Sequence, residues 1–381
     1  MYEDVIYLDN CATTRLLHQA AHALAFYGSH KYFNPSALYR GAVDVYKDVV
    51  EARKTIAWCL GCGEEEIIFT SGGSESNNTA IFGSVRNKKG RVITSLGEHM
   101  SVYAPFNELK SRGFDVQFAR IDKCGRVDIE HFKSLLSPDT VFVSAIHASN
   151  ETGAVNDIGL ISRLCKQANP DCVIHADGTQ AFLKAEFEVG SLGIDLYTIS
   201  GHKVHAPKGI GALYVRKGVK INLLVYGASQ EYGMRAGTEN AGAICAFAAA
   251  VRILHGDIRQ RIAYYRKLRE LFISTLKKNL GDFLINCEEG LPNIISLSIA
   301  GVKSEILIQM LSDKGIYVAS GSACSSRQKV SRVLKEMGVG QKYIEGSIRV
   351  SFSQFNTEEE VQLAAEAIAD TANRLRKMIR K

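Results

Sequence analysis

The chain has 381 residues, of which 46% are hydrophobic and 23% charged, and 46 Lys and Arg against 40 Asp and Glu give a formal net charge of +6. These values are typical of a globular protein and exclude collagen-like, low-complexity and disordered classes, and so mild a charge gives no reason to expect direct contact with nucleic acid. The longest apolar run, Ala241 to Val251, has 11 residues including one glycine, whereas a membrane-spanning helix needs about 20, so no association with a membrane is predicted.

The start of the chain and its cysteines bear on the compartment. Met1 to Asp4 include two acids where a secretory signal has a basic stretch followed by an apolar one, so we expect a cytoplasmic location. Nine cysteines are an odd number, and a chain of this length can bury a core without disulfides. The value of any cysteine should therefore lie in its reactivity.

Short β-rich runs alternate with helical stretches between residues 60 and 216, the pattern of a parallel sheet covered by helices. The predicted strands are 66–69, 91–94, 115–121, 140–146, 172–176, 196–199 and 211–215, and the predicted helices are 76–82, 128–136 and 157–168. This pattern predicts one large α/β domain.

The pattern changes after Thr238. Apolar residues recur every three or four positions from Leu254 to Leu276, as on one face of a long helix, which Gly256 is placed to kink or split. The elements predicted beyond it are strands at 294–299, ending near 320, and at 347–352, and helices at 304–314 and 330–337. A last helix opens with Thr357-Glu-Glu-Glu360, a capping box. These elements predict a second, smaller α/β domain, and a cleft between the two domains is the default ligand site.

Two strand ends carry polar residues. The segment Ile199-Ser-Gly-His-Lys-Val204 delivers Lys203 into a turn where it is well placed to be a nucleophile, although most lysines at such turns are simply solvated. Asp177 ends the apolar run that begins at Val173. A carboxylate there usually has a cationic partner, although an ordinary loop acid or cap would look the same.

A third element is the segment Phe69 to Asn78, in which a strand runs through small residues into the start of a helix. The free backbone N–H groups and the helix dipole make such a start an anion cradle, and the segment fits neither the Walker pattern nor the dinucleotide fingerprint. Cradle, carboxylate and lysine are the three parts that pyridoxal phosphate requires: one binds the phosphate, one keeps the pyridine nitrogen protonated and one forms the Schiff base.

With these motifs in this order, the chain resembles the cysteine desulfurases of the NifS/IscS type within the class V aminotransferase family. The resemblance runs almost end to end and rests on Tyr7–Thr14, Asn34–Ser36, Phe69–Asn78, Glu98–His99, Asn150–Gly153, His175–Gln180, Ser200–Lys203, Arg235–Thr238, Ser320–Cys324 and Ser347–Arg349. It implies fold type I of the PLP-dependent transferases, with a large domain at 15–253 built on a mostly parallel seven-stranded sheet. A smaller α/β domain would then combine 1–14 with 254–381.

The resemblance also implies roles around pyridoxal 5'-phosphate. Lys203 would bond to the cofactor, Asp177 would hold its pyridine nitrogen, Gln180 its phenolic oxygen, and His99 would stack on the ring and move protons. The residues implied for the phosphate are Gly73, Ser74, Ser200 and His202, with Thr238 from the partner subunit of a homodimer. The residues implied for substrate are Arg349, which would bind the carboxylate through its planar fork, with Asn34 and Asn150.

Cys324 would be the residue that accepts sulfur. Its neighbours from Ser320 to Ser326 are small or polar, so the sequence predicts an exposed, mobile loop carrying a thiol. By resemblance, this thiol takes the sulfur of L-cysteine as a persulfide, leaves L-alanine, and passes the sulfur to a protein acceptor, such as an iron–sulfur scaffold, or into thiolation.

Several positions depart from the family's pattern. Cys11 stands where Ala is usual, Ser149 where Asn is usual, His205 and Ala206 where Tyr and Gly are usual, and Gln354 where Arg is usual. These departures leave the acceptor, the rate and the reach of the cysteine loop open.

Alternatives to this assignment come from other residues. Cys59-Leu-Gly-Cys62 could indicate a metal or redox site, but it has no second pair at zinc spacing, so we expect no metal. Basic residues from Arg374 to Lys381 could contact tRNA or an acidic acceptor, or simply complement the helix dipole.

Selenocysteine lyase, sulfinate desulfinase and aminotransferase are competing activities. A non-catalytic scaffold is disfavoured because the lysine, aspartate, arginine and cysteine are all present.

Overall fold

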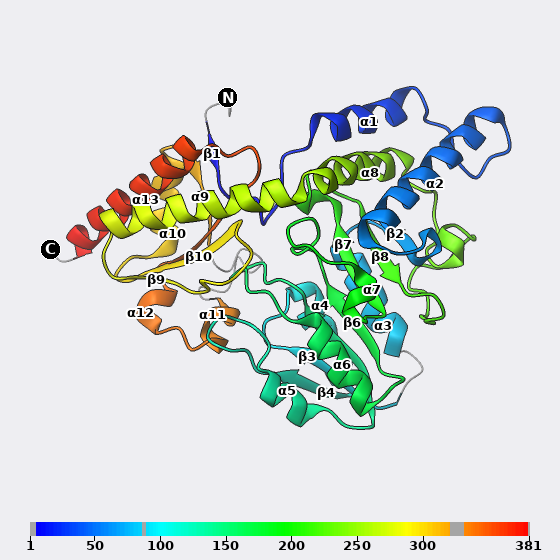
Figure 1. Ribbon diagram of the computed structural model, residues 1–381, viewed down its shortest axis with the longest axis horizontal. Coiled ribbons are helices and arrows are strands. Elements are labelled where there is room, and N and C mark those ends of the chain that lie inside the picture. The colour runs from blue at the N-terminus through cyan, green and yellow to red at the C-terminus, as the bar shows by residue number, and fades with distance from the viewer. Residues whose placement is uncertain (1–4, 86–88, 321–330, 380–381) are drawn as a thin grey trace.

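A seven-stranded sheet forms the centre of the larger part of this computed structural model, which describes residues 5–85, 89–320 and 331–379 (Figure 1). Its strands in spatial order are β2 (Ile67–Thr70), β8 (Gly211–Val215), β7 (Leu196–Ser200), β6 (Val173–Asp177), β5 (Thr140–Ile146), β3 (Arg91–Ser95) and β4 (Asp115–Ala119). Neighbouring strands are parallel except at β8, which runs antiparallel to β2 and β7. The mostly parallel seven-stranded sheet implied by the resemblance is confirmed.

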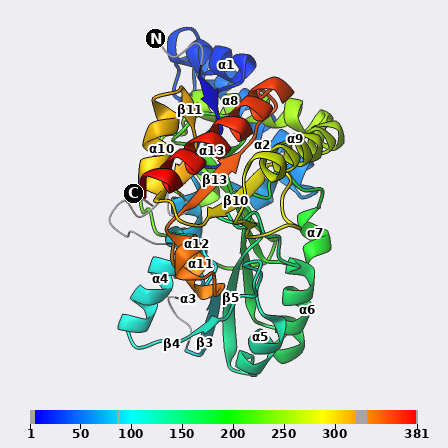
Figure 2. The same cartoon turned by 90° about the vertical axis from the view of Figure 1, so that its left-hand side faces the viewer.

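Helices cover both faces of this sheet (Figures 1 and 2). Successive residues of β2 enter different cores, Ile68 on one face and Ile67 and Phe69 on the other. The helices on the Ile68 side are α3 (Gly73–Val85) and α4 (Met100–Ser111), and those on the other side include α2 (Arg40–Leu60), α6 (Ile158–Ala168) and α8 (Ala241–Gly256). The strands β6, β7 and β8 are buried along their whole length, which explains their continuous apolar runs.

The smaller part is built on a second, antiparallel sheet. Its strands in order are β12 (Ala319–Ser320), β13 (Ser347–Ser351), β10 (Ile294–Ile299) and β9 (Phe283–Ile285), and the helices that share its core are α9 (Ile258–Asn279), α10 (Ser304–Ser312) and α13 (Glu358–Ile379). The start of the chain joins this part, because β1 (Ile6–Tyr7) pairs in parallel with β11 (Ile316–Tyr317) and Leu8 lies in the same core. This separation of cores is consistent with the domain boundaries expected from the sequence, which stay a prediction.

The long helix expected after residue 254 is divided. α8 ends at Gly256 and α9 begins at Ile258, and the two axes are bent by 75°. Among the described residues, no single helix has the length and apolarity to cross a membrane, and α8 with α9 meets that test only as a bent pair. The remaining helices are α1 (His18–Ser29), α5 (Ile129–Leu135), α7 (Val189–Leu192), α11 (Arg332–Glu336) and α12 (Gln341–Ile344).

The capping box predicted at α13 is confirmed. The backbone N–H of Thr357 donates to Glu360 Oε2 and the N–H of Glu360 donates to Thr357 Oγ1, both at 3.1 Å. Two free N–H groups of the helix start are thereby satisfied.

Candidate active site

A cavity of about 370 Å³ lies where the carboxyl ends of β6 and β7 meet the smaller part. Parallel neighbours end at one edge of a sheet, so Asp177 and Ser200 reach the same place. The predicted residues that line it are Gly73, Ser74, His99, Asn150, Asp177, Gln180, Ser200, His202, Lys203 and Arg349. The structure thus brings most of the predicted site residues together between the two parts.

Lys203 ends a short 3-10 turn that follows β7. Its Nζ donates to the backbone carbonyls of Cys11 at 2.6 Å and Ala12 at 2.7 Å, so the first residues of the chain hold the amine. Gln180 Nε2 donates to the same Cys11 carbonyl at 3.0 Å, and Gln180 Oε1 accepts from Lys184 Nζ at 2.9 Å. Burial lowers the pKa of Lys184 to about 8. No sequence motif indicates this second lysine.

Asp177 is buried and its carboxylate is oriented by two donors. Oδ2 accepts from Asn77 Nδ2 at 2.9 Å and Oδ1 accepts from the N–H of Thr179 at 3.0 Å. A Cβ on Gly178 would overlap the ring of Tyr197, so the chain can turn here only with glycine. Asn77 was also missed from the sequence, although it lies on the buried face of the helix that the cradle begins.

His99 is the N-cap residue of α4. Its Nδ1 accepts from the N–H of Ser101 at 3.1 Å and lies 2.8 Å from Ser101 Oγ, so a neutral imidazole carries its proton on Nε2. Ser101 Oγ also accepts from Asn77 Nδ2 at 2.8 Å. One chain of hydrogen bonds therefore joins His99 to Asp177 through Ser101 and Asn77.

The first turn of α3 and the end of β7 meet at the place where the sequence predicts an anion cradle. A Cβ on Gly73 would lie 3.0 Å from Thr179 Oγ1, so the close approach of these segments favours glycine. Burial lowers the pKa of His202 to about 4, with Lys203 acting in the same direction, so the imidazole is neutral at pH 7. Ser74, Ser200 and the helix start supply the polar groups of an anion site.

Arg349 brings a buried cation from β13 to the lining of the cavity. Nη1 donates to the carbonyl of Asn150 at 2.8 Å and Nη2 donates to Asp9 Oδ1 at 2.7 Å. Among the described residues, its buried Nε has no hydrogen-bond partner. A buried guanidinium with a donor left over is suited to bind an anion.

Two predicted residues lie outside this cavity. Thr238 and Asn34 are exposed and do not line the cavity of this single chain. Cys324 lies outside the described residues.

The departures from the family's pattern are accommodated locally. Cys11 contributes its backbone carbonyl to Lys203, a role that does not depend on its side chain. Ser149 Oγ accepts from the N–H groups of Glu151 at 3.3 Å and Thr152 at 3.2 Å and so stabilises the turn that carries Asn150. His205 has a positive φ of 60° and its Nδ1 lies 2.7 Å from the carbonyl of Arg15.

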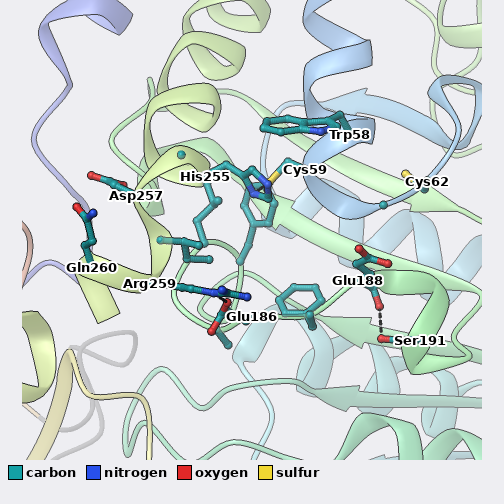
Figure 3. Close-up of a pocket in the computed structure, with 17 residues that line it drawn as sticks. Trp58, Cys59, Cys62, Glu186, Glu188, Ser191, His255, Asp257, Arg259 and Gln260 are labelled. Carbon is teal, nitrogen blue, oxygen red and sulfur yellow. Dashed lines mark hydrogen bonds and ion pairs between the residues drawn. The ribbon is translucent and has the colours of Figure 1, made fainter. Parts of the chain in front are cut away.

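A second cavity of about 1090 Å³ lies at the bend between α8 and α9 (Figure 3). It holds both cysteines of the Cys-x-x-Cys pair, with Cys59 Sγ 3.3 Å from His255 Nδ1 and Cys62 Sγ 3.6 Å from the carbonyl of Ala57. Burial raises the pKa of both Cys59 and Cys62 to about 12, which makes them poor nucleophiles. Within the part of the chain that the structure describes, no three metal-ligating side chains come together.

Comparison with known proteins defines the class. A family model described as aminotransferase class-V matches residues 6–363, and the chain belongs to this family. It is 36% identical over 377 residues to the cysteine desulfurase IscS of Dictyoglomus turgidum, covering 97% of this chain and 95% of that protein. A solved NifS-like protein is 33% identical, with a TM-score of 0.90 over 96% of this chain and 98% of that one. A structure titled SspA in complex with cysteine is 29% identical, with a TM-score of 0.82 over 92% of this chain and 99% of that one.

Proposed function

We propose that this protein is a pyridoxal phosphate-dependent cysteine desulfurase, which converts L-cysteine to L-alanine and transfers the sulfur through a persulfide on Cys324. The observation that carries the proposal is the single cavity in which Lys203, Asp177 and the start of α3 converge. Relatives named cysteine desulfurase that match nearly the whole chain, and a neighbour described as a complex with cysteine, support the choice of substrate.

Pyridoxal 5'-phosphate suits this cavity in size and in chemistry. Its volume of about 370 Å³ falls within the range of small-molecule sites. The cradle at the start of α3 would hold the phosphate. Asp177 would pair with the protonated pyridine nitrogen, and Lys203 would bond to the carbonyl carbon of the cofactor. When bound, the cofactor supplies a sink for the electrons released at the substrate's Cα.

Neighbouring residues of the chain orient the side chains of Asp177 and Gln180 and keep His202 neutral. Two hydrogen bonds leave the Asp177 carboxylate oriented and able to stabilise a protonated ring nitrogen. The neutral His202 can hydrogen-bond a phosphate without adding charge to the cradle. Lys184 and Cys11 fix both ends of the Gln180 amide, so that its orientation toward the ring is set before the cofactor binds.

Arg349 is proposed to bind the substrate carboxylate. Its Nη groups are anchored by Asn150 and Asp9, and its Nε remains as a donor. His99, held by Ser101, is proposed to stack on the ring and move a proton at Nε2. The thiolate of Cys324 would attack the substrate's sulfur, so that the S–S bond of the persulfide forms as the Cβ–S bond breaks, and Cβ would take up a proton to give alanine.

A homodimer is part of the proposal. Thr238, expected to reach the phosphate of the partner subunit, is exposed in this chain. Exposed apolar side chains gather along α1, α2 and the nearby loop before α8, namely Leu24, Tyr32, Leu38, Tyr39, Val43, Tyr46, Val225, Tyr226 and Tyr232. The loop packs on α2, because Arg53 forms a buried ion pair with Glu231 at 2.7 Å. A second copy of the chain would cover this surface and could supply Thr238 and Asn34.

The acceptor is proposed to be a protein of iron–sulfur assembly or thiolation. The basic end of α13 gives little support for a nucleic-acid contact there, because Arg376 donates to the carbonyls of Ala300, Gly281 and Asp282 and so holds the small part together. The cytoplasmic location expected from the sequence stays a prediction.

The test is a product assay on the purified holoenzyme. Incubation with L-cysteine and a thiol reductant should give alanine and sulfide in equal amounts, and Cys324→Ala should retain the bound cofactor's absorbance and release no sulfide. Normal sulfide release by Cys324→Ala would contradict the role of this thiol. Faster turnover of selenocysteine or cysteine sulfinate than of cysteine would favour the competing activities.

A further inference from the structure

The short helix α11 belongs to the smaller part in sequence but contacts the larger part beside the cavity. Val333 and Leu334 of this helix, with Met337 after it, form a buried cluster with Ile121, which follows β4. This cluster is separate from the cores of the two sheets. The hydrophobic cluster therefore holds α11 against the segment that follows β4.

Arg332, the first residue of α11, contacts the turn that carries His99. Its Nη1 donates to the carbonyl of Leu96 and its Nη2 donates to the carbonyl of Glu98 at 2.7 Å. Its Cζ lies 3.9 Å from the centroid of the Tyr103 ring, one turn into the helix that His99 caps. One planar cation thus holds the chain on both sides of His99.

Ser331, the N-cap residue of α11, contacts a second loop of the cavity. Its Oγ donates to Glu151 Oε2 at 2.5 Å and accepts from the N–H of Leu334 at 3.1 Å. Glu151 follows Asn150, whose carbonyl accepts from Arg349. The same end of α11 therefore touches the loops of two residues that line the cavity.

We propose that Arg332 is a positioning residue for the desulfurase reaction, a role that rests on the proposed function. From the smaller part it fixes the backbone before His99 and the first turn after it, and Ser331 fixes the turn of Asn150. Glu98 is buried, so its carbonyl needs a hydrogen-bond partner, which the guanidinium supplies. The orientation of the His99 imidazole over the cofactor ring would therefore depend on how the smaller part packs against the larger part.

The kinetic test compares holoenzyme variants at Arg332. In Arg332→Ala, kcat for alanine formation should fall about 10- to 100-fold, because misplacing a catalytic group by an ångström costs this much. KM for L-cysteine and the absorbance of the bound cofactor should change little, because Arg349 and Lys203 are untouched. Arg332→Lys should recover part of kcat, since an ammonium can bond one carbonyl but cannot span both and stack on Tyr103.

Arg376→Ala is the matched control. It removes a guanidinium that also holds backbone carbonyls, but within the smaller part. It should leave kcat unchanged. Equal losses of kcat in Arg332→Ala and Arg376→Ala would overturn the proposal, because the effect would then be general destabilisation.

Hydrogen–deuterium exchange of the holoenzyme separates this proposal from the proposed function. Arg332→Ala should speed exchange of the amides at 96–103, and Arg376→Ala should not. Unchanged exchange at 96–103 in Arg332→Ala overturns the proposal whatever the activity. Faster exchange there in a protein that forms no alanine from cysteine would contradict the desulfurase assignment and support the contact between Arg332 and the His99 turn.

Discussion

Two cavities of the molecule differ in size and in the reactivity of the side chains that line them. The cavity at the edge of the large sheet is smaller and has the more reactive lining, and the cavity at the bend between α8 and α9 is larger and has the less reactive one. The first has a volume of about 370 Å³ and the second about 1090 Å³. The smaller one gathers a lysine, a buried carboxylate, a helix start and a buried arginine, whereas the larger one holds poorly nucleophilic thiols and the exposed ion pair of Arg259 with Glu186. Convergence of buried polar groups at strand ends, rather than volume, marks the site.

Lys203→Ala should abolish the activity proposed for the smaller cavity. We expect turnover of L-cysteine to fall more than about 10³-fold, since the proposed point of covalent attachment is lost. The absorbance of the bound cofactor should also change. Lys208→Ala removes an exposed lysine of the loop between β7 and β8, which also carries Lys203, and should leave both measurements as in the wild type. Near-normal turnover in Lys203→Ala would exclude this cavity as the site of chemistry.

Asp177→Asn should produce the next largest effect. An amide cannot balance the charge of a protonated ring nitrogen, so kcat should fall about 100-fold or more. Asn77→Ala removes one of the two donors to that carboxylate and should cost about tenfold. Steady-state kinetics of the two variants with L-cysteine will test this order. A larger loss in Asn77→Ala than in Asp177→Asn would contradict the role given to the carboxylate.

Glu98 gives a prediction for pH. Burial raises its pKa from 4.5 to about 8, so between these values the folded protein keeps a proton that the unfolded chain releases. The contribution of Glu98 to the free energy of unfolding therefore decreases as pH rises through this window. Glu98→Gln cannot ionise, so its stability relative to the wild type should improve from pH 5 to pH 8 by on the order of a few kcal/mol. Denaturant unfolding of both proteins at the two pH values measures this, and a constant difference would contradict it.

Substitutions in the larger cavity should have little effect on turnover of L-cysteine. Replacing Cys59 and Cys62 together by Ala should leave kcat and KM for L-cysteine within about twofold of the wild type, because neither thiol lines the smaller cavity. The same assay on the double variant provides the measurement. A loss of sulfide release with alanine formation intact would instead give this pair a part in sulfur transfer.

Much of the fold could be predicted because buried strands have continuous apolar sequences. The runs at 140–146, 211–215 and 294–299 coincide with β5, β8 and β10. The sequences of α1, α2 and α4 have no such continuous apolar run and no Ser, Thr, Asp or Asn cap at their starts, so they are not evident from the sequence. The edge strand β9 is only three residues long and leaves equally little signal in the sequence.

The site was predictable where a motif carries the chemistry and not where residues act through other side chains. The cradle, Asp177 and Lys203 came from strand ends, and the roles of His99 and Arg349 from the resemblance. Asn77 contacts Asp177 from α3 across 100 positions, and Ser101 and Lys184 contact His99 and Gln180 from two and four residues away, in pairings that no motif indicated. Ser331 and Arg332 lie still further away in sequence from the loops that they contact.

Residues 9–12 complete the cavity together with β13. Asp9 accepts from Arg349, Cys11 N–H donates to Ser351 Oγ at 2.9 Å, and the carbonyls of Cys11 and Ala12 hold Lys203. These contacts join segments separated by up to 340 positions. Because nothing can pair with β13 before that strand has been synthesised, a nascent chain that has not yet reached β13 has no assembled cavity.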